Sequence, residues 1–502
     1  MSSLSRQFIK NVITSNISFA IRIVLNFFFI PYITFMLGSE AYGVWVIIFQ
    51  TITYFTLFDV GLNSAITKFV SGYLPKQDFR SINKILQTSQ LIYWGIGAIV
   101  FGLVYLFIIF FFDSFKIDSA ELIEDGKDAL IILGAYIAVQ FFAISYGTSH
   151  SAFQRHDVLK VLHASEEIVR ISVMTYLIYN GYGIVALAWA ILITTTIRSL
   201  AGVVWLKNLY PELKISFGSF DKESAKKLFN YSKVSFGIAL GWLVMFSSDS
   251  FILGLISSSV AAGIYAPGAQ LMLYLRNIIN MVGVPLIPAI SHLQSNNSID
   301  RIRSIYLKGV KYISFLSFLM ATGVILYAKP FTGLWLTAEF AQTADVMVVL
   351  AVGTAFFIPQ IIGNSVLFGN GHHRYVFYVL ICEVITKLGL SVILIPLFGV
   401  IGMALANTIP QVLFYTTLYP ILIGRNLNIS YFRIMFTLLK TAIPAVIIVY
   451  GIGTLLLSKL TITGWGDFFM QIGLILIPVA FYGYLIIDSD DKAELKKFIF
   501  KN

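Results

Sequence analysis

The chain has 502 residues, of which 58% are hydrophobic and 12% charged, and its formal net charge is +10. Soluble globular domains carry about a quarter charged residues, so this composition excludes a soluble domain and indicates an integral membrane protein. No compact domain rich in arginine and lysine is present to bind nucleic acid, and we expect no nucleic-acid partner. We attribute the net positive charge to basic residues concentrated on one face of a membrane. The single cysteine, Cys382, lies in an apolar run, so no intramolecular disulfide can form.

The first two apolar runs, residues 14–36 and 44–67, predict a transmembrane hairpin, since each exceeds the roughly 20 residues that a helix needs to cross a bilayer. A polar turn over 37–43 joins them, and each arm carries one charge, Arg22 in the first and Asp59 in the second. The basic N-terminus precedes a run too long for a signal-peptide core, and no small-residue cleavage site follows, so we expect a retained first helix.

Apolar windows along the whole chain predict an all-α membrane protein with about fourteen spans. The predicted spans are 14–36, 44–67, 85–112, 129–152, 162–180, 184–206, 234–256, 264–290, 310–328, 344–368, 377–395, 401–423, 437–457 and 468–487. Of the 35 lysines and arginines, only Lys116, Lys127, Lys329 and Lys459 fall in the connections on the side opposite the N-terminus. Cytoplasmic loops carry the excess of basic residues, so both termini are predicted to be cytoplasmic.

The chain also repeats itself. Gly43, just before the second span, has a counterpart in Gly263, 220 residues later, and Gly183 has one in Gly399, at an offset of 216. The offset crosses an even number of spans, so the two copies share their orientation, as in transporters built from parallel six-helix halves. We therefore expect an N-lobe at 1–206, a linker at 207–233 with an amphipathic surface helix over 221–232, and a C-lobe at 234–423. The last two helices lie in 424–487 and a cytoplasmic tail in 488–502. No loop is large enough for a catalytic domain outside the membrane, so we expect a transporter and not an enzyme.

Four cations within spans are candidates for binding substrate, because an ionisable residue at bilayer depth is costly and should face a cavity or a partner. Arg22 in the first span and Arg276 in the eighth come from opposite halves, and guanidinium grips phosphate oxygens with a planar fork, which suits a pyrophosphate. In the alternative interpretation, each of these two arginines forms an ion pair with a buried carboxylate such as Asp59 or Asp249. Arg198, near the inner end of span six, can also extend to the headgroups. Lys387 either lines the cavity, tuned by Glu383, or forms an intrahelical ion pair with Glu383 four residues away.

Four carboxylates complete the set of candidate residues: Asp59, Asp249, Glu167 and Glu383. Asp249 lies among the hydroxyls of Ser247, Ser248 and Ser250, where it could hold sodium or carry a proton, and the alternative is a hydrogen-bonded structural carboxylate. Glu167 lies beside Glu166 and Arg170 in span five, at the position that matches Glu383 in the repeat. This match favours a shared structural role.

Several motifs resemble a known family. Residues 37–45, followed by Asp59-Val60-Gly61-Leu62, are similar to the opening signature of bacterial polysaccharide exporters of the Wzx type. The same holds for Asp249-x-x-Ile252-Leu253-Gly254 and for Gly263-Ile264-Tyr265 at the start of the second half. The individual motifs are loose, and their order and spacing over the whole chain carry the resemblance.

The resemblance implies a flippase of the multidrug/oligosaccharidyl-lipid/polysaccharide (MOP) exporter superfamily, with two six-helix lobes in a V around a central cavity and two further C-terminal helices. The implied substrate is an undecaprenyl-pyrophosphate-linked oligosaccharide, of O-antigen or capsule type, moved by alternating access from the cytoplasmic to the outer leaflet of the bacterial inner membrane. Arg22 and Arg276 match the cationic cavity, and Asp249 and Glu383 are the acids nearest to the sodium site of lipid II flippases. We expect a monomer without a cofactor, coupled to a sodium or proton gradient, that contacts membrane lipids and glycan polymerase and chain-length machinery.

Two alternatives remain at this point. A MATE-like antiporter of organic cations needs a net acidic cavity, whereas the deep charges here include Arg22, Arg276 and Lys387. A membrane-embedded polyprenyl-glycan polymerase or ligase needs a large external loop, and the longest external connections, near 113–128 and 329–343, are short.

Overall fold

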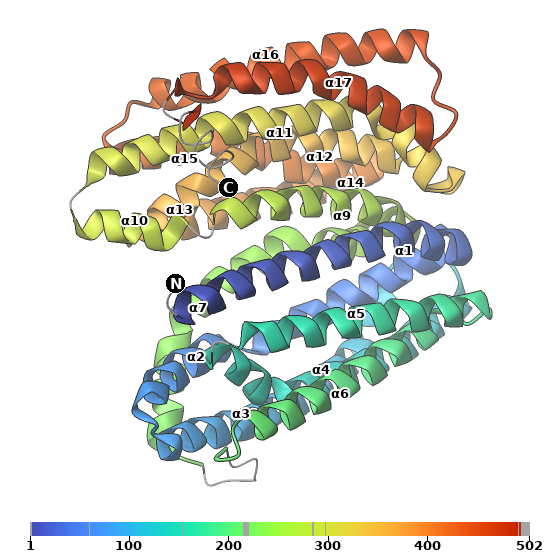
Figure 1. Ribbon diagram of the computed structural model, residues 1–502. Helices are drawn as coiled ribbons and strands as arrows, with labels where there is room; N and C mark the ends of the chain where they lie inside the picture. The colour runs from blue at the N-terminus through green and yellow to red at the C-terminus, as the bar shows by residue number, and fades with distance from the viewer. Residues whose placement is uncertain are drawn as a thin grey trace. The chain divides into compact units, whose positions relative to one another are not determined.

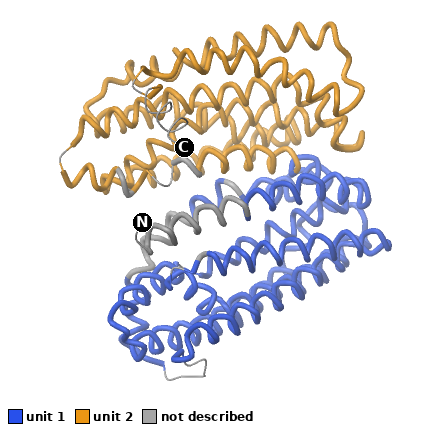
Figure 2. The backbone as a smooth tube through the Cα atoms, viewed as in Figure 1, with its two compact units in different colours: residues 1–266 blue, residues 267–502 orange. Residues whose placement is uncertain are grey.

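The computed structural model describes residues 3–59, 61–153, 155–213, 220–283, 286–296, 298–489 and 491–492, and these residues form helices and short connections without a strand. The chain divides into two compact units, unit 1 over residues 1–266 and unit 2 over residues 267–502 (Figure 2). The predicted lobes rest on the internal repeat, whereas the two units rest on how compactly the chain packs. The units therefore do not test the lobe boundaries, which stay a prediction.

Unit 1 is a bundle in which α4 packs against both α3 and α6, while α5 packs against α1 and α6 (Figure 1). Its elements are α1 (Ser3–Phe55), η1 (Thr56–Asp59), α2 (Leu62–Tyr73), η2 (Leu74–Lys76), α3 (Phe79–Phe111), η3 (Phe112–Ser114), α4 (Ala120–Ala152), α5 (His156–Tyr179), α6 (Ile184–Leu209), α7 (Lys222–Ser247), α8 (Asp249–Ile256) and the first residues of α9 (Ser259–Gly283).

Unit 2 is built around α11, which packs against α12 and α16. Its further elements are α10 (Leu286–Ser295), α11 (Ile299–Trp335), η4 (Ala338–Phe340), α12 (Thr343–Phe357), η5 (Ile358–Gln360), α13 (Ile361–Gly369), α14 (His373–Thr416), α15 (Leu418–Leu427), α16 (Tyr431–Lys459) and α17 (Trp465–Ile486). The last two helices join α11 through an apolar cluster that includes Phe315, Tyr327, Val449, Phe468 and Ile475.

Over its described residues, each predicted span falls on one helix, on part of a long helix or on consecutive helical elements, and nine helical segments of the described chain are long and apolar enough to cross a membrane. The protein is therefore a multi-pass, all-α membrane protein. Two long helices each contain a break at a glycine in the left-handed region, at Gly38 in α1 (φ 74°) and at Gly399 in α14 (φ 57°). The polar turn predicted over 37–43 is thus a break at one residue. Residues 222–232 of the predicted surface helix form the N-terminal part of α7 itself, and Asp221 caps the first turn of α7 by accepting from the Ser224 amide at 2.8 Å.

A close crossing of two helices in unit 1 depends on the paired glycines of the repeat. Ser39 and Gly43 lie one turn apart on α1, and their counterparts Ser259 and Gly263 lie one turn apart on α9. A Cβ on Gly43 would overlap the carbonyl oxygen of Ser259, and a Cβ on Gly263 would overlap that of Ser39. Small residues spaced four apart on both helices let the backbones touch, which is the usual device of membrane helix pairs. The crossing is symmetric, because each repeat supplies the same pair.

Main-chain hydrogen bonds from the connection between α3 and α4 support this crossing. The Lys116 amide donates to the carbonyl of Gly254 at 2.9 Å, and the Ser259 amide donates to the carbonyl of Lys116 at 3.0 Å. Glu40, on the α1 side of the crossing, accepts from the amides of Asp118 and Ser119 at 3.1 and 3.0 Å. This connection therefore holds both partners of the crossing in register.

We expect Gly43→Ala to lower the free energy of unfolding by about 1–3 kcal/mol, because the added methyl group meets backbone atoms that cannot turn away. Thermal unfolding of the purified protein in detergent measures the change. Gly95→Ala in α3 is the matched control, since no atom of a neighbouring element lies within 4 Å of the position that its added methyl group would take; it should leave the melting temperature unchanged or raise it slightly. Equal melting temperatures for the two variants would contradict the close crossing.

Candidate functional site

Three carboxylates inside the apolar segments each accept a hydrogen bond from a tyrosine hydroxyl. The pairs are Tyr93 with Asp59, Tyr265 with Asp249 at 2.6 Å, and Tyr415 with Glu383 at 3.0 Å. Each tyrosine comes from a different turn or helix than its carboxylate and is almost fully buried. A buried carboxylate needs such donors because an unsatisfied polar group in an apolar setting costs free energy. The structure thus gives all three acids a local partner.

Arg22 has a different environment. Its side chain is exposed on α1, and no carboxylate among the described residues forms an ion pair with it. Asp59, the partner that the alternative offered, is bonded to Tyr93 instead. The neighbouring Asn26 donates to the Arg22 carbonyl at 2.9 Å and to Oε1 of Glu167 at 3.1 Å. The guanidinium of Arg22 therefore carries its charge without local neutralisation by a described carboxylate.

In unit 2, three of the predicted residues belong to one electrostatic group. Glu383 and Lys387 are fully buried, and both Lys387 and Arg276 act on the Glu383 carboxylate. The guanidinium of Arg276 is half-buried and lies 5.5 Å from the centre of the Phe357 ring, within cation–π distance. Oε1 of Glu383 has no hydrogen-bond partner among the described residues, whereas Oε2 is held by Tyr415. These three predicted residues thus place two cations beside one anion.

Asp249 begins α8 at the break that separates it from α7, and Ser250 beside it is fully buried. Its Oδ2 atom accepts from Tyr265, so the hydrogen-bonded role left open by the sequence is present in the structure. The part of the chain that the structure describes has no group of three His, Cys, Asp or Glu side chains able to hold a metal ion. Sodium binding at Asp249 stays a prediction.

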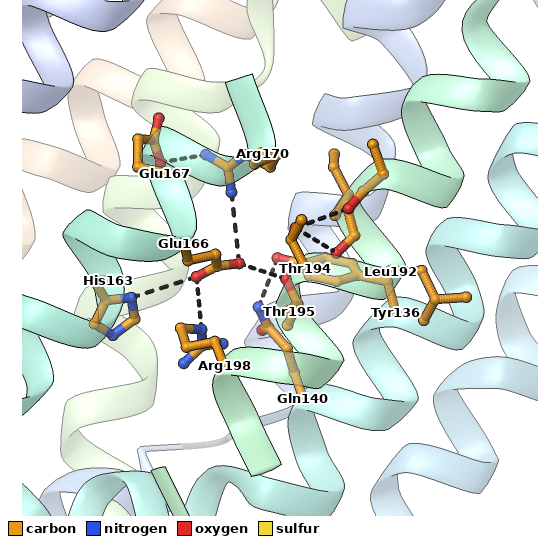
Figure 3. A network of polar contacts seen from close by, with 12 residues as sticks. Tyr136, Gln140, His163, Glu166, Glu167, Arg170, Leu192, Thr194, Thr195 and Arg198 are labelled. Atoms are coloured by element: carbon orange, nitrogen blue, oxygen red, sulfur yellow. Dashed lines mark hydrogen bonds and ion pairs between the residues drawn. The ribbon is translucent and has the colours of Figure 1, made fainter. Parts of the chain in front are cut away.

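A network of charges in unit 1 is centred on Glu166 of α5, a residue that the sequence did not single out as functional (Figure 3). Arg198 of α6 brings Nε to 2.6 Å from Oε2 of Glu166, although its N–H does not align as a hydrogen bond. Thr195 donates to Oε1 at 2.6 Å, and Arg170 lies 3.8 Å away. His163 completes the shell at 3.9 Å. Glu166 is thus the anion around which two arginines are arranged.

Glu167 points to other partners, since it is held by Arg170 and by Asn26 of α1. Glu166 and Glu167 together are therefore matched in charge by Arg170 and Arg198. Sequence spacing within α5 could reveal the pairs with Arg170, which lie three and four residues apart. The pairing of Glu166 with Arg198 depends on how α5 packs on α6, and no spacing in the sequence reveals it. Arg198 and His163 also line a cavity of about 690 Å³ within unit 1.

The comparisons with known proteins agree with this architecture. A family model described as "Polysaccharide biosynthesis protein" matches residues 8–294, more than half of the chain. The chain belongs to this family. A second model, "Lipid II flippase MurJ", matches residues 167–476, again more than half of the chain. The resemblance to Wzx-type flippases of the MOP superfamily is therefore confirmed.

Three curated relatives are distant in sequence, but the match covers most of the length of each. The chain is 22% identical to the "Uncharacterized membrane protein EpsK" of Bacillus subtilis, covering 68% of each chain. It is 19% identical to the "Putative O-antigen transporter" of Shigella flexneri, covering 81% of this chain and 95% of the relative. It is 22% identical to the "Probable flippase AglR" of Haloferax volcanii, covering 76% of each.

Two solved structures share the fold of this family member. A lipid II flippase MurJ in an inward closed conformation has a TM-score of 0.75 at 16% identity, covering 95% of this chain and 98% of that one. An inward-facing MATE family transporter of the MOP superfamily has a TM-score of 0.70 at 14% identity, covering 81% and 95%. At such low identity both likenesses concern the fold alone, so they do not distinguish a flippase from a drug antiporter.

We expect Glu166→Ala to reduce the free energy of unfolding by roughly 3 kcal/mol, because it leaves the largely buried Arg198 without its counter-charge. Glu223→Ala is the control, since that glutamate is 76% exposed and pairs with Lys227 at the surface, where an ion pair contributes about 0–1 kcal/mol. Thermal unfolding in detergent compares the two variants. A smaller loss for Glu166→Ala than for Glu223→Ala would show that the network contributes no stability.

Proposed function

We propose that the protein moves an undecaprenyl-pyrophosphate-linked oligosaccharide, of O-antigen or capsule type, from the cytoplasmic to the outer leaflet by alternating access. Membership in the polysaccharide biosynthesis protein family supports a flippase for lipid-linked glycans. The names of the Shigella and Haloferax relatives, an O-antigen transporter and a flippase, agree with this class. The finer identity of the substrate rests on the charges described above.

The observation that carries the proposal is the environment of Arg22. It lies eight residues into the first predicted span, about 12 Å along a helix axis. A guanidinium at such depth costs at least ~2.5–3.5 kcal/mol unless it meets water or an anion. Because no described carboxylate neutralises Arg22, an anionic substrate is the counter-charge that fits it. A pyrophosphate offers the oxygens that a planar guanidinium binds in a bidentate manner.

Arg276 and Lys387 supply further positive charge in unit 2, where both act on the Glu383 carboxylate. We therefore assign Arg22 and Arg276 to the pyrophosphate and keep Lys387 as a cavity residue. This cationic character disfavours the MATE-like antiporter of organic cations, whose binding site needs negative charge. A polymerase or ligase is disfavoured by the match to the lipid II flippase model over more than half of the chain.

The remaining assignments belong to the same proposal. The family supports a place in the bacterial inner membrane, and the distribution of lysines and arginines supports a cytoplasmic position for both termini. Asp249 and Glu383 are proposed to couple transport to a sodium or proton gradient. The protein is proposed to act as a monomer that hands its substrate to glycan polymerase and chain-length machinery.

We expect Arg22→Gln and Arg276→Gln each to slow translocation by roughly ten- to a hundredfold, because each loses a charge-assisted hydrogen bond to the pyrophosphate of about 1.5–3 kcal/mol. The measurement is translocation of a fluorescent undecaprenyl-pyrophosphate oligosaccharide in proteoliposomes. Arg80→Gln is the matched control, since Arg80 is exposed in the first turn of α3 and forms no ion pair among the described residues; it should translocate like wild type.

Two results would contradict parts of the proposal. Unchanged translocation in both variants would keep the flippase and move the two arginines to structural roles. No translocation by wild type under any imposed ion gradient, with efflux of a cationic dye instead, would support the antiporter.

A further inference from the structure

The chain that follows α17 is attached to α11, and these two helices pack together with α16 in unit 2 (Figure 1). α17 ends at Ile486, and Ile487 has extended backbone angles (φ −66°, ψ 129°). The Lys492 amide then donates to the carbonyl of Asp488 at 2.9 Å, which closes one helical turn. This turn contacts the N-terminal third of α11. α17 is therefore followed by a segment with a defined attachment point on another helix.

Two carboxylates of this segment and three donors of α11 form a cluster that we call the tail clamp. Lys308 Nζ lies 2.6 Å from Oδ1 of Asp491. Lys311 Nζ lies 2.7 Å from Oδ1 of Asp488. The Tyr312 hydroxyl joins the two pairs, since it donates to Oδ2 of Asp491 at 2.6 Å and accepts from the Asp488 amide at 3.2 Å. The hydrogen bonds from Lys308 and Tyr312 lower the pKa of Asp491 below its usual range, so this carboxylate is charged at neutral pH.

The tail clamp lies where α11 enters the membrane. The predicted span of this helix begins at residue 310, between the two lysines, and the distribution of basic residues assigns this end to the cytoplasmic face. The side chains of the four charged residues are 22–43% exposed. Thr441 of α16 donates to the carbonyl of Lys311 at 3.0 Å, so the backbone that carries the donors is held by a contact outside the clamp. The donors are thus fixed at the level of the lipid headgroups.

The two carboxylates show that this part of α11 binds anionic oxygens. Phosphate oxygens are acceptors that ammonium and hydroxyl groups bind in the same way, and anionic headgroups are concentrated at this level of the cytoplasmic leaflet. Exposed ion pairs are weak and are screened by salt, so a competing anion can displace them. Both acids lie after α17, so they can leave the donors without rearranging a membrane span.

We propose that Lys308, Lys311 and Tyr312 form a binding site for the headgroup of an anionic phospholipid, with Asp488 and Asp491 as its built-in competitors. Headgroup binding and tail attachment exclude each other, because both use the same donors. The anionic lipid content of the leaflet thereby sets how firmly the segment after α17 is fastened to α11. The apolar cluster that joins α16 and α17 to α11 keeps the helices themselves in place. The inference goes beyond the proposed function, since it concerns a lipid that is not transported.

The first test is native mass spectrometry of the purified protein titrated with phosphatidylglycerol. Asp491→Asn should raise the affinity about fivefold, because the apparent affinity is reduced by the fraction of molecules in which the tail occupies the site. Asp300→Asn is the matched control, since it makes the same change of charge in the first turn of α11, where Asp300 is 88% exposed and pairs with Arg303; it should bind like wild type. Lys311→Gln should weaken binding about tenfold, because it loses a charge-assisted hydrogen bond.

A second test follows the tail itself by hydrogen exchange in nanodiscs. The amides of Asp488 and Lys492 are bonded in the clamped turn. In wild type they should exchange about tenfold faster in phosphatidylglycerol than in phosphatidylcholine, because headgroups open the clamp. In Lys311→Gln they should exchange fast in both lipids. The Thr463 amide, which donates to Asp467 at the other end of α17 at 2.9 Å, is the internal control and should exchange equally in both.

Equal affinities of wild type and Asp491→Asn for phosphatidylglycerol would overturn the proposal and leave the tail clamp as a structural cluster of ion pairs. Equal exchange of the clamped amides in the two lipids would do the same. Displacement of phosphatidylglycerol by an equal concentration of inorganic phosphate would also overturn it, because the site would then be one for a soluble anion.

Discussion

The rest of the structure depends on the cost of placing a charge at bilayer depth. A charged side chain there must meet a counter-charge, a hydrogen-bond donor or water. The protein satisfies this constraint in two ways. Asp59, Asp249 and Glu383 each accept from a tyrosine hydroxyl. Glu166 and Glu167 are matched by two arginines. Arg22 alone among the predicted candidates combines exposure with the absence of a carboxylate partner among the described residues, and this exception is the strongest indication of function.

The two halves of the repeat use matched positions differently. Gly43 and Gly263 are equivalent in sequence and in structure, because each allows the backbone of the other helix to come close. Glu167 and Glu383 are equivalent in sequence only. Glu167 is held by an arginine and an asparagine, while Glu383 is held by a tyrosine beside a buried lysine. Where the two backbones touch there is no room for a side chain, so both copies of the repeat have glycine at this position. A buried carboxylate needs only a donor, which different residues can supply.

The charge network and the cavity of unit 1 form one arrangement. Glu166 is expensive to bury, and Arg198, Arg170 and Thr195 surround its carboxylate. Removing either partner of this pair would leave the other charge buried without compensation, which is strongly destabilising. In this arrangement Glu166 positions Arg198 at the wall of the cavity.

The membrane class, the spans, the repeat and the family could all be predicted from the amino-acid sequence, because hydropathy, basic-residue asymmetry and motif order are properties of the chain that need no contacts. The sequence also located the costly charges, since any ionisable residue within an apolar run stands out. The partner that each charge meets could not be predicted in this way. Tyr93, Tyr265 and Tyr415 carry no sign of their role in the sequence, and Arg198 meets Glu166 only because α5 packs on α6. Hydrogen bonds and ion pairs act over a few ångströms between side chains far apart in the chain, and packing alone sets those distances.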